Sequence, residues 1–133
     1  MSADKVIYAL LSGAGGVTSI VVDRIYPVVL PQGKTFPAIT FEVVSAQRIG
    51  AIDAYAPSHL TRSRVQVNAL AQNHPAVVAL IEAIKAALQF QRGVFNGITT
   101  HSVLHAGEGP EQYDQQLGVF MQPIDFFITH EAN

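Results

Sequence analysis

The sequence has 133 residues, of which 49% are hydrophobic and 14% are charged, and its formal net charge is −2. This length suits one domain with its own core, which we expect to span residues 1–133. The net charge gives no electrostatic case for binding nucleic acid, which normally requires a basic face. Cysteine is absent, so disulfides, thiolate metal sites and a cysteine nucleophile are excluded. No apolar run approaches the roughly 18 residues that span a bilayer, and no signal-peptide pattern opens the chain, so we expect a soluble protein.

The first half of the chain predicts two helical segments followed by two strands. Residues 2–12 have apolar positions at helical spacing, and Gly13 follows as a stop signal. Residues 17–22 add a helical turn. Residues 36–48 are rich in β-branched and aromatic side chains, and residues 61–71 alternate apolar with polar positions, as half-buried strands do. Because no helix separates these two strands, we expect them to pair as an antiparallel hairpin.

The second half predicts one long helix and two further strands. Asn73 is a suitable N-cap, Gly93 a suitable end, and five apolar residues form one stripe of the helix: Val77, Leu80, Ile81, Ile84 and Leu88. A strand over residues 98–105, a polar turn over 107–116 and a closing strand over 117–130 follow. The predicted order is α-β-β-α-β-β, which gives an α+β domain with a four-stranded antiparallel sheet and helices packed on one face.

The charge content is low for a small globular domain, in which about 25% of residues are normally charged. Since large apolar patches usually mark interfaces, we expect part of the outside to be buried against another subunit. The long connection over residues 50–60 carries Ile52, Asp53 and Tyr55 where polar residues would be usual, and we predict that this loop lies near a subunit contact.

No catalytic or metal-binding pattern emerges. The glycine run at residues 13–16 lacks the preceding strand and following lysine of a phosphate-binding loop. His101 and His105 lie on one predicted strand about 13 Å apart, too far to bind one metal ion. His59, His74 and His130 are scattered, and the carboxylates form no readable acid–base pair. We therefore expect no catalytic residue, no cofactor, no metal site and no enzymatic activity.

Asp125 is an acidic residue within an apolar strand. If it is buried it needs a partner, and the candidates are four arginines: Arg24, Arg48, Arg62 and Arg64. The alternative is an outward-facing carboxylate on an edge strand.

Seven segments together resemble the phage tail completion family, a small α+β group from tailed-phage and prophage morphogenesis modules. They are residues 7–12, 23–27, 31–33, 36–41, 64–68, 77–84 and 124–128. The family has no catalytic residues to transfer. Among the matching residues, we expect structural roles for Arg24, Tyr26, Pro27, Asp125 and Phe126. For the subunit interface we expect Ile52, Asp53, Tyr55, Arg62 and Arg64.

The resemblance implies a structural protein of the virion tail, assembled in the bacterial cytoplasm. It would form a homo-oligomeric ring, expected to be a hexamer, that caps the tail tube and joins it to the head connector. Its partners would be the tail tube protein and the head connector protein. Two alternatives stay open: a small non-catalytic ligand-binding domain that uses its open sheet face as a pocket, and another minor head or connector protein.

Overall fold

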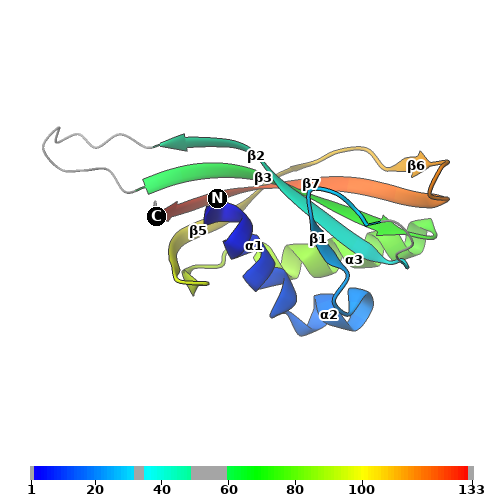
Figure 1. Ribbon diagram of the computed structural model, residues 1–133, viewed down its shortest axis with the longest axis horizontal. Helices are drawn as coiled ribbons and strands as arrows, with labels where there is room; N and C mark the ends of the chain where they lie inside the picture. Colours follow the sequence, from blue (N-terminus) through cyan, green and yellow to red (C-terminus); the bar gives the residue numbers. More distant parts are fainter. Residues whose placement is uncertain (1, 32–34, 49–59, 132–133) are drawn as a thin grey trace, which may run out of the picture.

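The computed structural model describes residues 2–31, 35–48 and 60–131. These residues form three helices and seven strands, with all three helices on one face of an elongated sheet (Figure 1). The elements are α1 (Ser2–Ser12), α2 (Gly15–Val21), β1 (Ile25–Pro27), β2 (Ala38–Arg48), β3 (Leu60–Ala71), α3 (His74–Leu88), β4 (Gly93–Phe95), β5 (Ile98–Glu108), β6 (Gln112–Asp114) and β7 (Val119–Glu131).

The sheet has the strand order β1-β2-β3-β7-β5-β4, and β6 pairs with β7 outside this path. The pair β1–β2 is parallel and all other pairs are antiparallel. The α+β class and the one-sided helix layer agree with the prediction, but the four-stranded, wholly antiparallel sheet is wrong. The three additional strands have only three residues each, which is too short to show a period-two pattern.

The closing strand β7 lies in the middle of the sheet, between β3 and β5 (Figure 1). Its side chains alternate between the two faces, as successive strand residues must. Ile124, Phe126 and Ile128 are fully buried against the helices, whereas Asp125 and Phe127 face the opposite side and are half-buried. The core is therefore built around a strand that also supplies the centre of the open face.

Helix α3 begins as predicted, because the Asn73 side chain accepts a hydrogen bond of 2.9 Å from the Ala76 amide. The five residues of the predicted stripe are all buried. The helix ends at Leu88, however, and not near Gly93, which is the first residue of β4. Phe90 adopts a left-handed φ of 64°, and this turn carries the chain from the helix to the outer edge of the sheet.

The segment predicted as a polar turn, residues 107–116, is more ordered than expected. Strand β5 continues to Glu108, and β6 pairs with the start of β7 as a short antiparallel hairpin at that end of the sheet. The long connection between β2 and β3 lies outside the described residues, so the prediction for Ile52, Asp53 and Tyr55 stays a prediction.

Candidate functional site: the open face and the edges of the sheet

The sheet face that the helices leave open carries an ion pair between neighbouring strands. Arg64 of β3 places its Nε and Nη2 atoms each 2.8 Å from Oδ2 of Asp125 on β7. The two residues are diagonal neighbours, because Arg64 lies opposite Phe127 and Asp125 lies opposite Gln66. Of the four arginines considered for Asp125, the structure therefore selects Arg64.

Phe127 lies beneath two guanidinium groups on the same face. The Arg62 guanidinium carbon is 4.0 Å from the centroid of the Phe127 ring, and that of Arg64 is 5.5 Å away. Both distances allow cation–π attraction. The open face thus presents a stacked aromatic and cationic cluster, in which Arg64 pairs with Asp125 and Arg62 stacks on Phe127.

A shallow hollow of about 220 Å³ adjoins the ion pair. It is lined by side chains and backbone from three strands and the bend after β5: Arg64, Gln66, Gly107, Glu108, Gly109, Pro123 and Asp125. Pockets that hold small molecules are usually about 300–1,000 Å³ and mainly apolar. This hollow is smaller and lined by charged groups.

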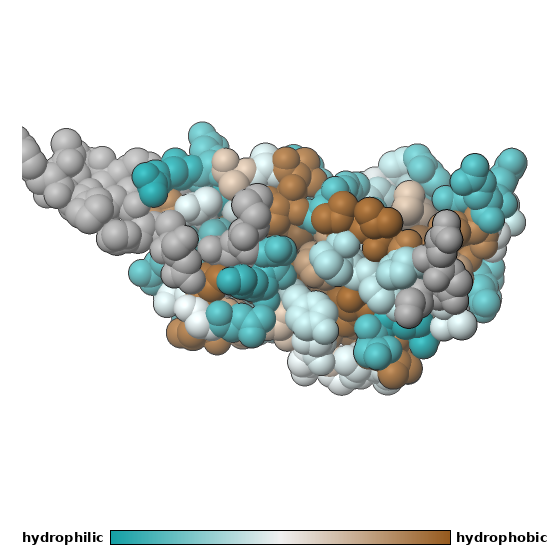
Figure 2. Space-filling model, viewed as in Figure 1, coloured by the Kyte–Doolittle hydropathy of each residue, from teal (hydrophilic) through white to brown (hydrophobic). Residues whose placement is uncertain are grey.

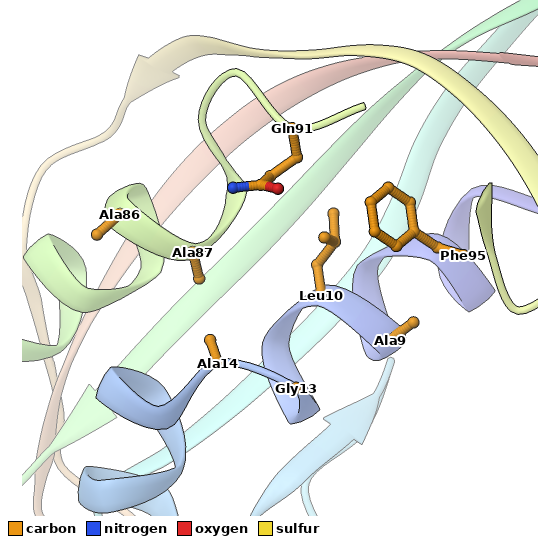
Figure 3. A pocket seen from close by; sticks show the side chains of 8 residues that line it. All are labelled: Ala9, Leu10, Gly13, Ala14, Ala86, Ala87, Gln91 and Phe95. Atoms are coloured by element: carbon orange, nitrogen blue, oxygen red, sulfur yellow. The ribbon is translucent and has the colours of Figure 1, made fainter. Parts of the chain in front are cut away.

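A second hollow, of about 340 Å³, opens on the helix side. Figure 3 shows it between α1, the start of α2, the end of α3 and β4, with Ala14 and Ala87 projecting into it from facing elements. Small side chains and Gly13 account for most of its lining, with Gln91 as a polar group. The packing of alanines between helices explains this hollow without a ligand.

Arg24 joins the helix layer to the edge of the sheet. Its Nε donates a hydrogen bond of 2.8 Å to the Pro37 carbonyl, and its Nη2 donates one of 3.4 Å to the Ile20 carbonyl. The Arg24 carbonyl in turn accepts from the amide of Ile39. Both side-chain contacts go to backbone oxygens, and the guanidinium contacts no carboxylate among the described residues.

The other residues for which a structural role is expected lie in two strands. Tyr26 and Pro27 belong to β1, where they pair with Thr40 and Phe41 of β2. Phe126 is fully buried in β7.

The histidines are dispersed over the fold. His130 is buried with its Nε2 3.0 Å from the Ser63 hydroxyl, while three others each lie near one glutamate: His74 by Glu111, His101 by Glu131 and His105 by Glu108. His59 lies outside the described residues. Within the described part of the chain, no three His, Asp or Glu side chains gather in a way that could bind a metal ion.

Lys85 of α3 contacts both Glu82 and Glu108, and so connects the helix to the end of β5. The hydrogen bond to Glu108 is the largest influence on its ammonium group and raises the pKa of Lys85 above the ordinary value of 10.5. Burial opposes this effect, and the charges of Glu108 and Glu82 add to it. This contact is a structural clamp between the helix layer and the sheet.

The sequence pattern did not reveal a set of exposed apolar side chains on the margins of the sheet. They include Val28, Val29 and Val44 on one margin and Phe90, Val94 and Leu104 on the other. In Figure 2, hydrophobic surface gathers over the segment that follows β1 and over the adjacent part of β2. In the sequence, only the low charge content predicted exposed apolar surface, and it did not predict the position of that surface.

These features define a small α+β domain with apolar margins. The chain belongs to the family of the tail completion protein gp17, whose sequence profile matches residues 5–114. It is therefore a structural protein of the phage tail.

The fold is similar to that of a chain in the virion of a native gene transfer agent particle. The TM-score is 0.74, the identity is 12%, and the match covers 96% of this chain and 92% of that chain. At this identity the likeness shows a shared fold. No curated protein sequence matches significantly. Each helix in the described residues is too short or too polar to cross a lipid bilayer.

Proposed function

We propose that this protein forms a homo-oligomeric ring that caps the phage tail tube and joins it to the head connector. The observation that carries the proposal is the family match over residues 5–114, which includes most of α1, the whole of α2 and α3, and every strand except β7. The likeness in fold to a chain of a complete virion particle supports a place within a multi-subunit assembly. The partners are the tail tube protein and the head connector protein, and six copies form the ring.

The surface chemistry supports assembly with copies of the same chain. Only 14% of the residues are charged, and large apolar side chains are exposed along the sheet margins. Exposed apolar patches of this kind usually mark protein–protein contacts. A head-to-tail contact closes into a ring when its rotation allows closure.

The ring does no chemistry in this proposal. The ligand-binding alternative needs a pocket on the open sheet face, but there Arg62 stacks on Phe127 and Arg64 pairs with Asp125. The hollow beside them is small and charged. Side chains of the protein itself thus occupy this part of the open face.

The test combines electron microscopy with solution mass. The purified protein is imaged alone and with purified tail tubes of its phage, and its mass is followed by light scattering over a wide concentration range. We expect rings in solution or at one end of each tube. A protein that stays monomeric at all concentrations and leaves both tube ends bare would overturn the proposal.

A further inference from the structure

Two groups of exposed apolar side chains lie at opposite margins of the sheet. The first, here the β1–β2 margin, consists of Val28, Val29 and Val44, which are 55–69% exposed. The second, here the β4–β5 margin, consists of Phe90, Val94 and Leu104, which are 46–74% exposed. Because β1 and β4 are the two ends of the strand order, the margins face away from each other.

The β1–β2 margin is formed where β1 ends. The Val28 amide donates a hydrogen bond of 2.8 Å to the Phe41 carbonyl of β2, so Val28 and Val29 lie beside that strand. Val44 is the extra residue at the β2 bulge, where the pairing with β3 shifts between Val43 and Ser45. The three valines therefore belong to one continuous margin.

The β4–β5 margin is formed where α3 passes to the sheet. The Phe90 amide donates a hydrogen bond of 2.8 Å to the Val103 carbonyl, which fixes Phe90 on the outer edge of β5. Leu104 is the next residue along that strand, and Val94 lies opposite Thr99 in the β4–β5 pair. Phe90 is the largest side chain of this margin and the most exposed.

Backbone strain occurs at one residue of each margin. Val28 has φ 63° and Phe90 has φ 64°, in the left-handed region that bulky and β-branched residues rarely adopt. Such a conformation costs about 1–3 kcal/mol and tends to persist at functional sites, although Val22, an exposed valine outside both margins, also has a φ of 61°. Here the strained residues also hold apolar side chains in water, so neither feature helps the isolated chain to fold.

The strands at the two margins are incompletely paired. β1 covers only Ile39 to Phe41 of β2, and β4 covers only Ile98 to Thr100 of β5. Among the described residues, the rest of each outer edge has no strand beside it. Since the pairings β2–β3, β3–β7 and β7–β5 are all antiparallel, β2 and β5 run in opposite directions. Copies placed side by side would bring these two edges together in antiparallel sense.

We propose that the β1–β2 margin of one copy binds the β4–β5 margin of the next, with Phe90 as the apolar anchor of the contact. The proposal rests on the proposed ring and names the two surfaces that build it. Because the two surfaces differ, the contact is head-to-tail, and each copy has one of each to offer. Buried aromatic anchors usually contribute most of the binding energy of such contacts.

The experiment uses two charged variants, Val28→Asp and Phe90→Asp. Aspartate tolerates a left-handed φ better than valine or phenylalanine, so each variant should fold at least as stably as the wild type while losing its apolar contact. The oligomeric state of each variant is measured by sedimentation. The conditions are those in which the wild-type protein assembles, whether or not these require tail tubes. We expect each variant alone to be monomeric, with the contact weakened by about 30-fold or more.

A mixture of the two variants gives the decisive readout. Each variant keeps one intact margin, and these two margins complement each other, so the equimolar mixture should form a heterodimer that grows no further. Val78→Asp is the matched control, since Val78 is an exposed valine of α3 outside both margins, and this variant should assemble normally.

The outcomes separate the two proposals. If Val28→Asp and Phe90→Asp both assemble as well as the wild type, this contact is wrong and the proposed ring still stands. If both variants are monomeric and their mixture also stays monomeric, the two margins do not pair head to tail. A wild-type protein that never assembles, alone or on tail tubes, would overturn the ring and the contact together.

Discussion

Arg64 and Asp125 connect β3 to β7 through two contacts of 2.8 Å to one carboxylate oxygen. The pair crosses the sheet diagonally, so it spans two rows of the ladder rather than one. It lies at the centre of the open face, over the two strands with the longest continuous pairing in the fold. It is therefore placed to stabilise the middle of the sheet.

Replacing Asp125 with Ala should lower the stability modestly. The side chains of Arg64 and Asp125 are 42% and 19% exposed, and pairs in contact with solvent contribute about 1 kcal/mol at most. The expected fall in the melting temperature is about 3 °C for a chain of this size. Circular dichroism melts of Asp125→Ala, Arg64→Ala and the double variant would measure the coupling. If the two single changes prove fully additive, the pair contributes nothing.

Replacing Arg24 with Met should be more damaging. It removes the hydrogen bonds to the Pro37 and Ile20 carbonyls, which join α2 to the start of β2. Hydrogen bonds from charged donors contribute about 1.5–3 kcal/mol, and we expect a loss of about 2 kcal/mol in urea denaturation. Arg48→Met is the matched control, because Arg48 is exposed, and it should stay within about 0.5 kcal/mol of wild type. Equal effects at both positions would contradict a structural role for Arg24.

The parts of the fold that could be predicted from sequence are those with a strong local pattern. Helix α3 has a cap at Asn73 and a stripe that is buried at every expected position, and β3 alternates between buried and more exposed residues from Arg62 to Ala69. The strands β1, β4 and β6 have three residues each and are held by pairing with distant strands, so no local pattern marks them. The position of β7 between β3 and β5 is likewise a long-range property.

The same distinction applies to the site. The need of Asp125 for a partner could be predicted from its apolar neighbours, but the choice of Arg64 depends on the register between β3 and β7. The exposed set around Val28 and Phe90 could not be predicted, because apolar residues next to strands are usually core. Their exposure follows from two left-handed turns that the sequence does not mark with glycine.

Removing the Lys85 ammonium should destabilise the protein at neutral pH and have no effect at high pH. Since the Glu108 hydrogen bond raises the pKa of Lys85 in the folded state, its stabilising effect is fully present below about pH 10.5. The effect is lost as the pH rises through the higher folded-state value. Urea denaturation of wild type and Lys85→Met should differ at pH 8 and converge towards pH 12. Glu108→Gln should remove most of this pH dependence, and a constant gap across the range would contradict the assignment.

Two glycine-to-alanine changes should shift stability in opposite directions. A Cβ at Gly109 would lie 2.7 Å from Cγ of Pro123, and the Gly109 amide also bonds to the Pro123 carbonyl, so the two segments cannot separate freely. Forced overpacking of this kind costs about 1–3 kcal/mol. At Gly16, within α2, a Cβ meets no atom within 4 Å, and alanine should gain about 0.5 kcal/mol from its helix propensity. Chemical denaturation of both variants beside the wild type measures the two shifts. If Gly109→Ala leaves the stability unchanged, Pro123 must move aside. The close contact between β7 and the bend that follows β5 would then not constrain the fold.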